Sequence, residues 1–270
     1  MIENLYAFSR DHNGRVEMKN PSFALVTGAS QGLGRAFAQA LAARKQNVIL
    51  VARSREKLET LASELKRSQS IQAEALEFDL ACPAAGSRLA QQLRDRKLRV
   101  NLLVNNAGFG VRGEFRNLTL LRQMEMLQLN NAAAVELTYA LLPLLTEHPQ
   151  AGIINVSSTA GFQPIPYASL YAATKSFLMT FSLGLQEELR AHGVSVVTLC
   201  PGRILTHTNG PRKFGFIYQS PEDVAREALE SLANGGGLVI PGFVNKLSVF
   251  AQRFIPRRTV PRLVGRMSRR

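Results

Sequence analysis

The sequence predicts an α/β fold, a doubly wound parallel sheet of about seven strands in a single domain. Three observations predict it. Short β-rich apolar runs alternate with helical patterns along most of the 270 residues. The apolar runs are continuous, which suits strands that helices cover on both faces. No internal repeat, low-complexity stretch or linker rich in proline and glycine divides the chain, so one domain with right-handed crossovers accounts for the pattern.

Six apolar runs predict buried strands, and a seventh, weaker run has the same character. The strong runs span residues 23–27, 47–51, 100–104, 152–156, 194–199 and 237–240, and the weaker one spans 71–78. Between the runs, apolar residues adopt helical spacing. After Ser54, a suitable N-cap, this spacing is shown by Leu58, Leu61, Ala62 and Leu65. Another helix start is predicted at 220–223, where a proline and two acidic residues follow a serine.

The formal charge of +13 is concentrated near the C-terminus. From residue 246 onward there are eight basic residues and no acidic one, which leaves +5 for the first 245 residues. A body with so ordinary a charge does not predict a nucleic-acid-binding surface.

Several protein classes are excluded by the rest of the composition. Residues 1–20 mix six charged side chains with few apolar ones and lack a signal-peptide core. Charges interrupt each apolar run well before about 18 residues, the shortest usual membrane span. Two cysteines, Cys82 and Cys200, cannot build a disulfide framework or a cysteine zinc cluster, and the four histidines show no metal-ligand spacing. We therefore expect a cytoplasmic protein without a metal, either free or on a membrane surface.

A glycine-rich turn follows the first predicted strand. Thr27-Gly28-x-x-x-Gly32-x-Gly34 leads directly into a helical pattern. Such a turn brings backbone close to a pyrophosphate, and the opening helix offers its N–H groups and positive dipole end to the anion. The strand before and the helix after favour a dinucleotide site over the alternative, a tight turn without a ligand.

The end of the second predicted strand discriminates between NAD and NADP. An NAD site carries an acidic residue there for the ribose 2′-hydroxyl, whereas an arginine accommodates the 2′-phosphate of NADP. This sequence has Arg53 and Ser54 and no acidic residue. Arg53 could pair with a phosphate and Ser54 could donate a hydrogen bond. NADP(H) is therefore favoured, and the alternative is a solvated arginine at a helix start.

Tyr171 and Lys175 stand four residues apart in a helical stretch. This spacing places the phenol and the ammonium on one helix face. A nearby positive charge favours phenolate, so it can lower the pKa of the tyrosine toward neutrality, where proton transfer works best. The alternative is an ordinary surface pair.

Further motifs follow one another along the chain: Asp79-Leu80, Asn105-Asn106-Ala107-Gly108, Asn130, Asn155-Val156-Ser157-Ser158 and Pro201-Gly202-x-x-x-Thr206. Together with the glycine turn and the Tyr171/Lys175 pair, they resemble the motifs of the short-chain dehydrogenase/reductase family over roughly 22–242. Ser158 lies thirteen residues before Tyr171, as the family's active-site serine does, and is favoured over Ser157. The resemblance implies a Rossmann-like fold and assembly as a homodimer or homotetramer.

The resemblance also implies roles for individual residues. Tyr171 would protonate the substrate carbonyl as hydride arrives from the nicotinamide, and Ser158 would hydrogen-bond the same oxygen. Lys175 would lower the pKa of Tyr171 and hold the ribose hydroxyls, and Asn130 would position a water that relays protons to Lys175. The residues expected to bind the cofactor are Gly28, Ser30, Gln31, Gly32, Leu33, Gly34, Arg53, Asp79, Leu80, Asn106, Ala107, Gly108, Tyr171, Lys175, Pro201, Gly202 and Thr206.

We therefore expect an NADP(H)-dependent carbonyl reductase. The Ala52-Arg53-Ser54 segment resembles that of the steroid and 3-ketoacyl reductase branches. Apolar loops after the strand ends favour a lipophilic ketone or aldehyde, although their side chains could instead pack on one another as a lid. The residues expected at the substrate are Phe109, Phe162, Phe214 and Tyr218. The alternative, a non-catalytic dinucleotide-binding adaptor at a membrane surface, would not need the full catalytic set.

Residues 245–270 predict two short basic amphipathic helices separated by Pro256. The apolar stripe comprises Leu247, Phe250, Ala251, Phe254 and Ile255 before the proline and Val260, Leu263, Val264 and Met267 after it. Two partners stay open for this stripe: an anionic lipid surface, or the protein's own body or a second subunit. We divide the chain into an N-terminal extension (1–20), a dinucleotide-binding catalytic domain (21–244) and a basic amphipathic segment (245–270).

Overall fold

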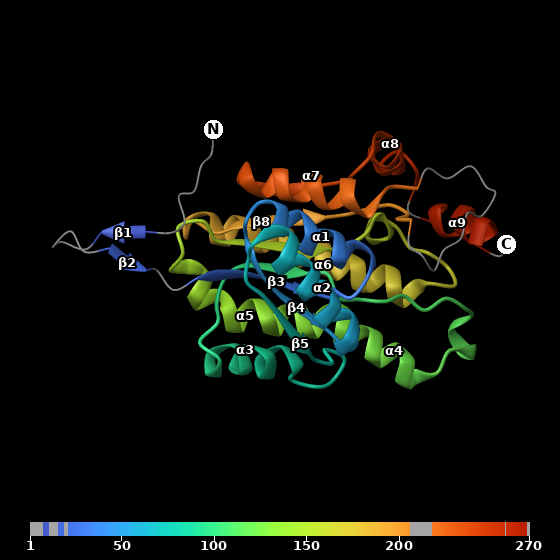
Figure 1. Ribbon diagram of the computed structural model, residues 1–270. Coiled ribbons are helices and arrows are strands. Elements are labelled where there is room, and N and C mark those ends of the chain that lie inside the picture. The colour runs from blue at the N-terminus through green and yellow to red at the C-terminus, as the bar shows by residue number, and fades with distance from the viewer. Residues whose placement is uncertain (1–7, 11–15, 19–20, 206–217, 257, 269–270) are drawn as a thin grey trace.

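Seven parallel strands run through the centre of the molecule in the order β5-β4-β3-β6-β7-β8-β9 (Figure 1). The structure, a computed structural model, describes residues 8–10, 16–18, 21–205, 218–256 and 258–268. The strands are β3 (Ser22–Thr27), β4 (Asn47–Ala52), β5 (Ala73–Glu77), β6 (Arg99–Asn105), β7 (Gly152–Val156), β8 (Ser195–Leu199) and β9 (Gly236–Val239). The α/β prediction is confirmed, and so is a strand within each of the seven predicted runs.

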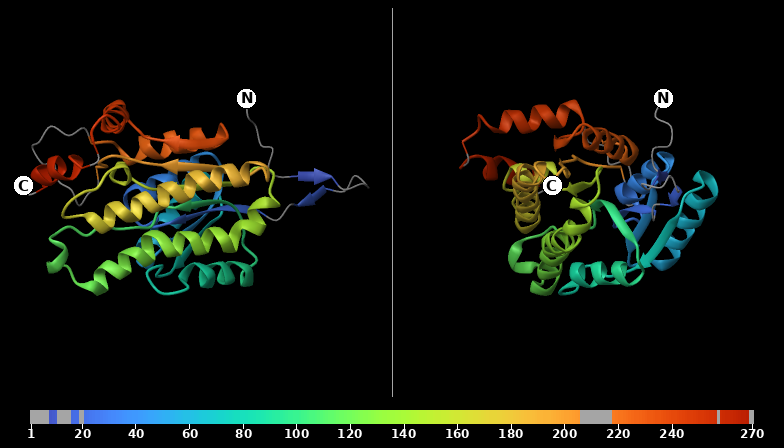
Figure 2. Two further views of the ribbon diagram at one scale, coloured as in Figure 1. Left: turned by 180° about the vertical axis from the view of Figure 1, so that it is seen from behind. Right: turned by 90° about the vertical axis from the view of Figure 1, so that its left-hand side faces the viewer.

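Helices cover both faces of the sheet, as Figure 2 shows. One face carries α1 (Gly32–Ala43), α2 (Arg55–Gln69) and α7 (Pro221–Ala233). The other carries α3 (Ala85–Asp95), α5 (Ala133–Thr146) and α6 (Ser169–Arg190). Phe37 and Leu58 are fully buried in the first layer, and Leu89 and Leu141 in the second.

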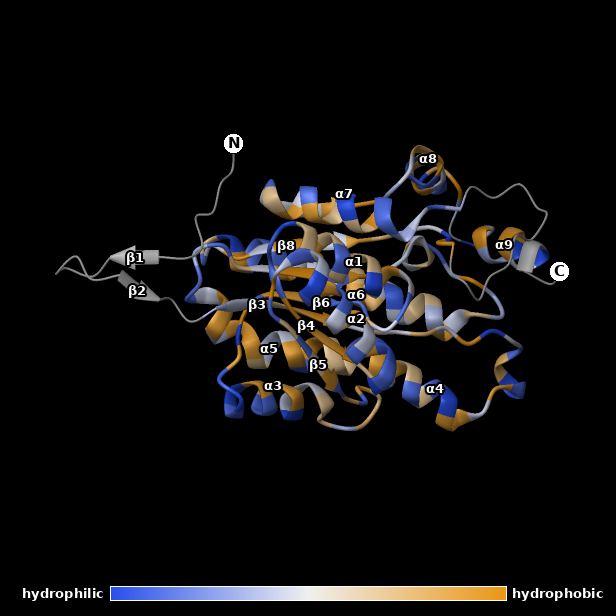
Figure 3. Ribbon diagram, viewed as in Figure 1, coloured by the Kyte–Doolittle hydropathy of each residue, from blue (hydrophilic) through white to orange (hydrophobic). Residues whose placement is uncertain are grey.

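The continuous apolar runs are explained by this double covering. Ala24 and Val26 of β3 pack into one helical layer and Leu25 packs into the other, and all three are fully buried. Figure 3 shows hydrophobic residues along the central strands. A parallel strand covered on both faces has no solvent side, so its sequence has no polar alternation.

The strand order reverses at β3, which lies between β4 and β6. The chain leaves β3 into α1 on one face, whereas the chain after β6 leads to α5 on the other. Helices that diverge in this way leave a crevice at the carboxyl ends of the two strands, where ligands of doubly wound sheets bind.

The remaining elements lie outside the seven-stranded sheet. Strands β1 (Phe8–Arg10) and β2 (Val16–Met18) pair antiparallel in a sheet of their own. The other elements are η1 (Phe115–Asn117), α4 (Leu120–Leu127), η2 (Gln128–Ala132), η3 (Thr159–Phe162), α8 (Phe243–Gln252) and α9 (Val260–Ser268). Among the described residues, no helix combines the length and the apolar character that a membrane span requires.

Helices α8 and α9 lie on either side of Pro256, as predicted. The prediction that their apolar stripe could pack on the protein's own body is wrong for α8. Leu247 and Phe250 are exposed, whereas Val249, which the stripe did not include, is buried. The helix therefore turns a different face inward from the one that the apolar spacing marks.

Candidate active site

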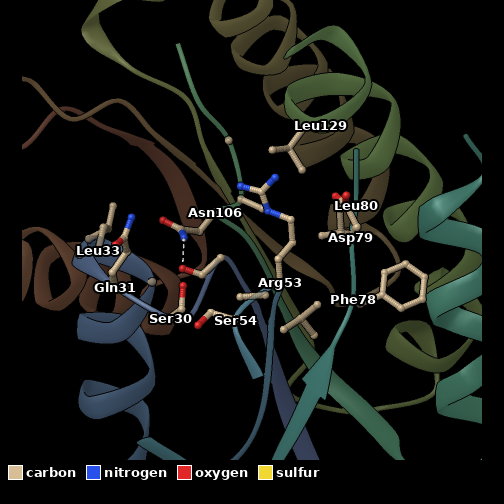
Figure 4. A pocket seen from close by; sticks show the side chains of 17 residues that line it. Ser30, Gln31, Leu33, Arg53, Ser54, Phe78, Asp79, Leu80, Asn106 and Leu129 are labelled. Atoms are coloured by element: carbon tan, nitrogen blue, oxygen red, sulfur yellow. Dashed lines mark hydrogen bonds between the residues drawn. The ribbon is translucent and has the colours of Figure 1, made fainter. Parts of the chain in front are cut away.

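One cavity, of about 430 Å³, opens at the carboxyl ends of β3, β4 and β6 (Figure 4). The predicted cofactor residues that line it are Gly28, Ser30, Gln31, Gly32, Leu33, Gly34, Arg53, Asp79, Leu80, Asn106, Ala107 and Gly108. Sequence reasoning missed four more, which are Val51, Ala52, Phe78 and Leu129. Each of the four stands one or two positions before a predicted site residue. Their place next to those residues in the sequence was the one feature that could have identified them as part of the cavity lining.

Glycine is required at two positions of the turn between β3 and α1. Gly28 has a φ of +67°, and a Cβ there would lie 2.9 Å from Nδ2 of Asn106. A Cβ on Gly34 would meet the carbonyl oxygen of Gly28 and lie 2.6 Å from the same nitrogen. Side chains at these positions would therefore push the turn away from the residues after β6.

Hydrogen bonds hold the turn to the segment after β6. Nδ2 of Asn106 donates to the carbonyl of Thr27 at 2.8 Å. Oγ1 of Thr27 accepts from the backbone N–H groups of Asn106 and Ala107, each at 2.9 Å, and donates to the carbonyl of Val104 at 3.1 Å. Because Thr27 is buried, these bonds fix two walls of the cavity relative to each other.

The N-terminus of α1 faces the cavity without a capping side chain. Its N-cap residue, Gln31, makes no side-chain hydrogen bond to the helix, and the first turn contains no acidic residue. Gly32 and Leu33 of this turn line the cavity. The first N–H groups and the positive dipole end are thus available to an anion such as a pyrophosphate.

Arg53 and Ser54 line the cavity from the end of β4. Figure 4 shows the guanidinium group of Arg53 extending over the cavity, and within the described chain no carboxylate pairs with it. After the neighbouring strand β5, Oδ1 of Asp79 accepts from the N–H of Ala81 at 2.9 Å, so Asp79 caps a turn and also contributes to the cavity wall. Arg53 is thus the positively charged side chain that is available to bind a phosphate at the β4 side of the cavity.

Asn130 lies in η2, a π-helical turn between α4 and α5. Its Oδ1 accepts from the N–H of Phe109 at 3.0 Å, and its Nδ2 donates to the carbonyl of Phe109 at 2.9 Å and to Oγ1 of Thr174 at 3.0 Å. Such wide turns are frequent at functional sites. The buried amide therefore connects the loop after β6 to α6, next to Lys175.

The structure distinguishes the two serines at the end of β7. Ser157 is buried, and its Oγ donates to the carbonyl of Lys175 at 2.7 Å. Oγ of Ser158 accepts from the N–H of Ala160 at 3.1 Å, and its single proton can go either to the carbonyl of Pro201 at 3.4 Å or to the phenol oxygen of Tyr171. Ser157 thus serves the packing of α6, and Ser158 faces the tyrosine.

Tyr171 stands in the first turns of α6 against the loop after β6. A Cβ added to Gly110 would lie 2.9 Å from the tyrosine ring, so glycine makes room for it. The expectation that Lys175 lowers the pKa of Tyr171 is wrong for this structure. Burial raises that pKa above 10.0 because it disfavours phenolate, and only the hydrogen bond from Ser158 opposes the rise.

Lys175 is buried, with 6 % of its surface exposed. Its Nζ donates to the carbonyl of Val156 at 2.8 Å and lies 3.6 Å from a Cβ built on Gly108, a residue of the cavity wall. Burial lowers its pKa from 10.5 to about 8. The ammonium therefore lies next to the cavity wall, and its removal from water lowers the stability of the charged form.

These groups can transfer a proton to a substrate oxygen. Tyr171 remains protonated at neutral pH because of its raised pKa, and Ser158 adds a second hydrogen-bond donor beside it. Lys175 supplies positive charge beside Gly108, a residue of the cavity wall. An oxygen that gains negative charge between Tyr171 and Ser158 would be stabilised by both.

The predicted substrate residues are placed less clearly. Phe109 is half-buried, and the guanidinium of Arg122, which sequence reasoning did not single out, lies 3.9 Å from its ring centre. Phe162 and Tyr218 are half-buried, and Phe214 lies outside the described residues. So does Thr206 of the cofactor set. Pro201 and Gly202 lie beside Ser158 and α8 rather than in the cavity wall.

A family model described as short chain dehydrogenase matches residues 22–213. The chain is 32 % identical over 217 residues to the ketoacyl reductase HetN of a Nostoc strain, which covers 78 % of this chain and 75 % of the relative. It is 30 % identical over 214 residues to the human very-long-chain 3-oxoacyl-CoA reductase, covering 78 % of this chain and 68 % of that one.

The fold is similar to that of a short-chain dehydrogenase from Sphingobium yanoikuyae, solved in complex with NADPH. The TM-score is 0.76 at 28 % sequence identity, and the match covers 87 % of this chain and 97 % of the other.

Proposed function

This chain belongs to the short-chain dehydrogenase family, and from that premise we propose that it is an NADP(H)-dependent carbonyl reductase for a lipophilic small molecule. Proteins of this family are oxidoreductases that bind a nicotinamide dinucleotide. One observation carries the proposal for catalysis. Ser158 lies beside the phenol of Tyr171, whose ring packs against Gly110, and Lys175 lies next to Gly108, a residue of the cavity lining.

The arginine at the end of β4 supports NADP(H) over NAD(H). Arg53 has no acidic partner in the described chain, and Ser54 beside it can donate a hydrogen bond. A guanidinium group binds a phosphate with paired, charge-assisted hydrogen bonds. The similar Sphingobium enzyme was solved with NADPH, which agrees with this assignment.

The nicotinamide, when bound, supplies hydride to the carbonyl carbon. The chain's own residues act on the oxygen. Tyr171 donates its phenolic proton to that oxygen, and Ser158 hydrogen-bonds it as negative charge develops. Lys175 holds positive charge at the cavity wall, and Asn130, tied to Phe109 and Thr174, orients a proton path toward it.

The raised pKa of Tyr171 keeps the phenol in the form that carbonyl reduction uses. Reduction needs a protonated phenol, which persists at neutral pH when the pKa lies above 10.0. Oxidation of an alcohol needs phenolate, which burial disfavours. At neutral pH Tyr171 is therefore in the form that can donate a proton to a carbonyl oxygen.

Relatives and loop composition support a lipophilic substrate. The relatives include a ketoacyl reductase and a very-long-chain 3-oxoacyl-CoA reductase. Phe109 follows β6 and Phe162 ends η3, and both are half-buried apolar side chains of the kind that bind apolar substrate parts. Arg122 against Phe109 adds a positive charge at the same place.

Assembly as a homodimer or homotetramer is part of the proposal. Phe177 and Leu183 of α6 are exposed, and Phe177 stacks on Phe181 with 6.2 Å between ring centres. A second subunit would cover these side chains. The free thiols of Cys82 and Cys200 agree with a reducing compartment, which we propose to be the cytoplasm.

The test is Tyr171→Phe, assayed by NADPH oxidation with a panel of ketones and 3-oxoacyl thioesters. We expect turnover to fall at least ~10²-fold, the low end for loss of a general acid, with NADPH binding by fluorescence unchanged. Tyr139→Phe, at an exposed tyrosine of α5, is the matched control and should keep full activity.

A fully active Tyr171→Phe protein would refute the assigned chemistry. NADPH binding without turnover on any carbonyl in the panel would instead support the non-catalytic adaptor.

A further inference from the structure

Helix α8 turns an apolar stripe away from the protein. Phe243, Leu247 and Phe250 stand at i, i+4 and i+7, so they share one face. Phe243 is 78 % exposed, and the other two are each 55 % exposed. Val249, on another face, is buried. Amphipathic surface helices normally turn their apolar stripe toward the core, so this orientation calls for a partner.

The stripe continues beyond the end of α8. Phe254 is 74 % exposed and packs edge-to-face on Phe250, with 5.3 Å between ring centres. On α9, Leu263 is 48 % exposed, whereas Val260 is buried. Exposed large apolar side chains that contact one another, as Phe250 and Phe254 do, mark an interaction surface.

The charged side chains that α8, α9 and the segment between them carry all have one sign. Glu230 is the last acidic residue of the chain, and the basic residues that follow it in the described segments are exposed. They are Lys246, Arg253, Arg258, Arg262 and Arg266. None of these five forms an ion pair with a described carboxylate. Unpaired cations beside exposed aromatic side chains are complementary to a surface that is apolar inside and anionic outside.

Both helices lie next to the candidate active site. The side chain of Asn245 in α8 would be 2.5 Å from a Cβ on Gly202, which follows the Pro201 that Ser158 contacts. A Cβ on Gly265 in α9 would be 3.2 Å from Pro166, in the segment between Ser158 and Tyr171. Figures 1 and 2 show α8 and α9 at the end of the molecule where α6 begins.

We propose that α8 and α9 dock the protein on the surface of an anionic lipid bilayer, with Phe243, Leu247, Phe250 and Phe254 inserted at the interface and the arginines against the headgroups. This goes beyond the proposed function and does not require it. If the reductase function holds, docking brings the active site to the bilayer, where a lipophilic substrate accumulates.

A second copy of this chain fits the same surface poorly. In a two-fold interface the patch would meet itself, so exposed cations would face one another without an acidic residue to pair with. Within the part of the chain that the structure describes, the stripe is not covered by the protein's own body. An anionic bilayer satisfies both the apolar and the charged parts at once.

The test is flotation of the full-length protein with vesicles of phosphatidylcholine, alone or with about 30 % phosphatidylglycerol. We expect the protein to float with the anionic vesicles and to stay behind with the zwitterionic ones. Phe243→Ser/Leu247→Ser/Phe250→Ser should abolish flotation. Because these side chains are exposed, the variant should fold, which circular dichroism and NADPH binding would verify.

A charge pair supplies the matched control. Arg262→Glu/Arg266→Glu should weaken binding to anionic vesicles at least ~25-fold. Each cation near the surface strengthens binding about fivefold, and the variant loses two of them. Arg96→Glu/Arg99→Glu has the same net charge but lies where α3 ends and β6 begins, at the opposite edge of the sheet, and should bind as the wild type does.

The proposal fails if the serine triple variant floats like the wild type, or if both arginine pairs have equal effects. It also fails if the wild-type protein ignores phosphatidylglycerol while the serine variant changes from a larger to a smaller oligomer in light scattering. That last result would identify a second copy as the partner.

Discussion

Replacing Lys175 by methionine should stabilise the protein at neutral pH. The ammonium is buried at the cavity wall, and burial lowers its pKa from 10.5 to about 8. Methionine has a similar length and no charge, so it removes the desolvation cost while it fills the same space. Active sites often retain a charge at such a cost because the reaction uses it.

The sign and the size of this change in stability follow from the pKa of Lys175 in the unfolded chain, 10.5, and in the folded protein, about 8. Between about pH 8 and pH 10.5 the unfolded chain binds a proton that the folded protein lacks, so stability rises with pH in this window. At pH 7 the lysine is charged in both states, and its burial costs about 3 kcal/mol. At pH 10 less than about 1 kcal/mol of that cost is left.

The assay is urea unfolding of the wild type and Lys175→Met at pH 7 and pH 10. The free energy of unfolding of the variant, minus that of the wild type, should be about 2.5 kcal/mol larger at pH 7 than at pH 10. Taking the difference between pH values removes pH-independent effects, such as the lost bond to the carbonyl of Val156.

Lys57→Met, at an exposed lysine of α2, is the control and should show the same small difference at both pH values. If the difference for Lys175→Met also stays constant within about 0.5 kcal/mol, the reasoning from burial is refuted, since uncertainties of that size are ordinary for denaturant data.

Three more outcomes are expected. Arg53→Ala should weaken NADPH binding ~10–100-fold with little change for NADH, because it removes a charge-assisted pair; equal losses for both cofactors in a fluorescence titration would contradict this. Asn155→Ala should lower the free energy of unfolding by ~1–3 kcal/mol, since Oδ1 of Asn155 accepts from Nδ2 of buried Asn105 at 2.8 Å; an unchanged urea midpoint would argue against it. In a pH profile, kcat/KM for carbonyl reduction should decline above about pH 8, where Lys175 loses its charge, and a profile flat to pH 10 would separate that charge from catalysis.

Strand positions were the most predictable part of the fold. Each run of buried apolar residues, such as 23–27, became a strand because continuous apolar sequence suits a strand covered on both faces. The glycine turn was also predictable, since its conformation depends on neighbours in sequence. Gly28 with its φ of +67° is an example.

Other features needed contacts between distant residues. No sequence pattern placed Arg122 on the ring of Phe109, because the pairing depends on how α4 packs over the loop after β6. The direction of the pKa shift of Tyr171 was predicted wrongly for a related reason. Four-residue spacing from Lys175 indicated a shared helix face, but burial by the rest of the fold raises the pKa of Tyr171, and the group that opposes the rise is Ser158 rather than Lys175.

The sequence by itself determined the fold, the dinucleotide turn and the order of the candidate catalytic residues, because these depend on local spacing and backbone preference. The tertiary structure decided which serine faces Tyr171, how burial sets the protonation of Tyr171 and Lys175, and that α8 turns its apolar stripe to the outside. Those properties depend on which groups long-range packing removes from water, and helical spacing alone shows that a stripe exists but not which way it faces.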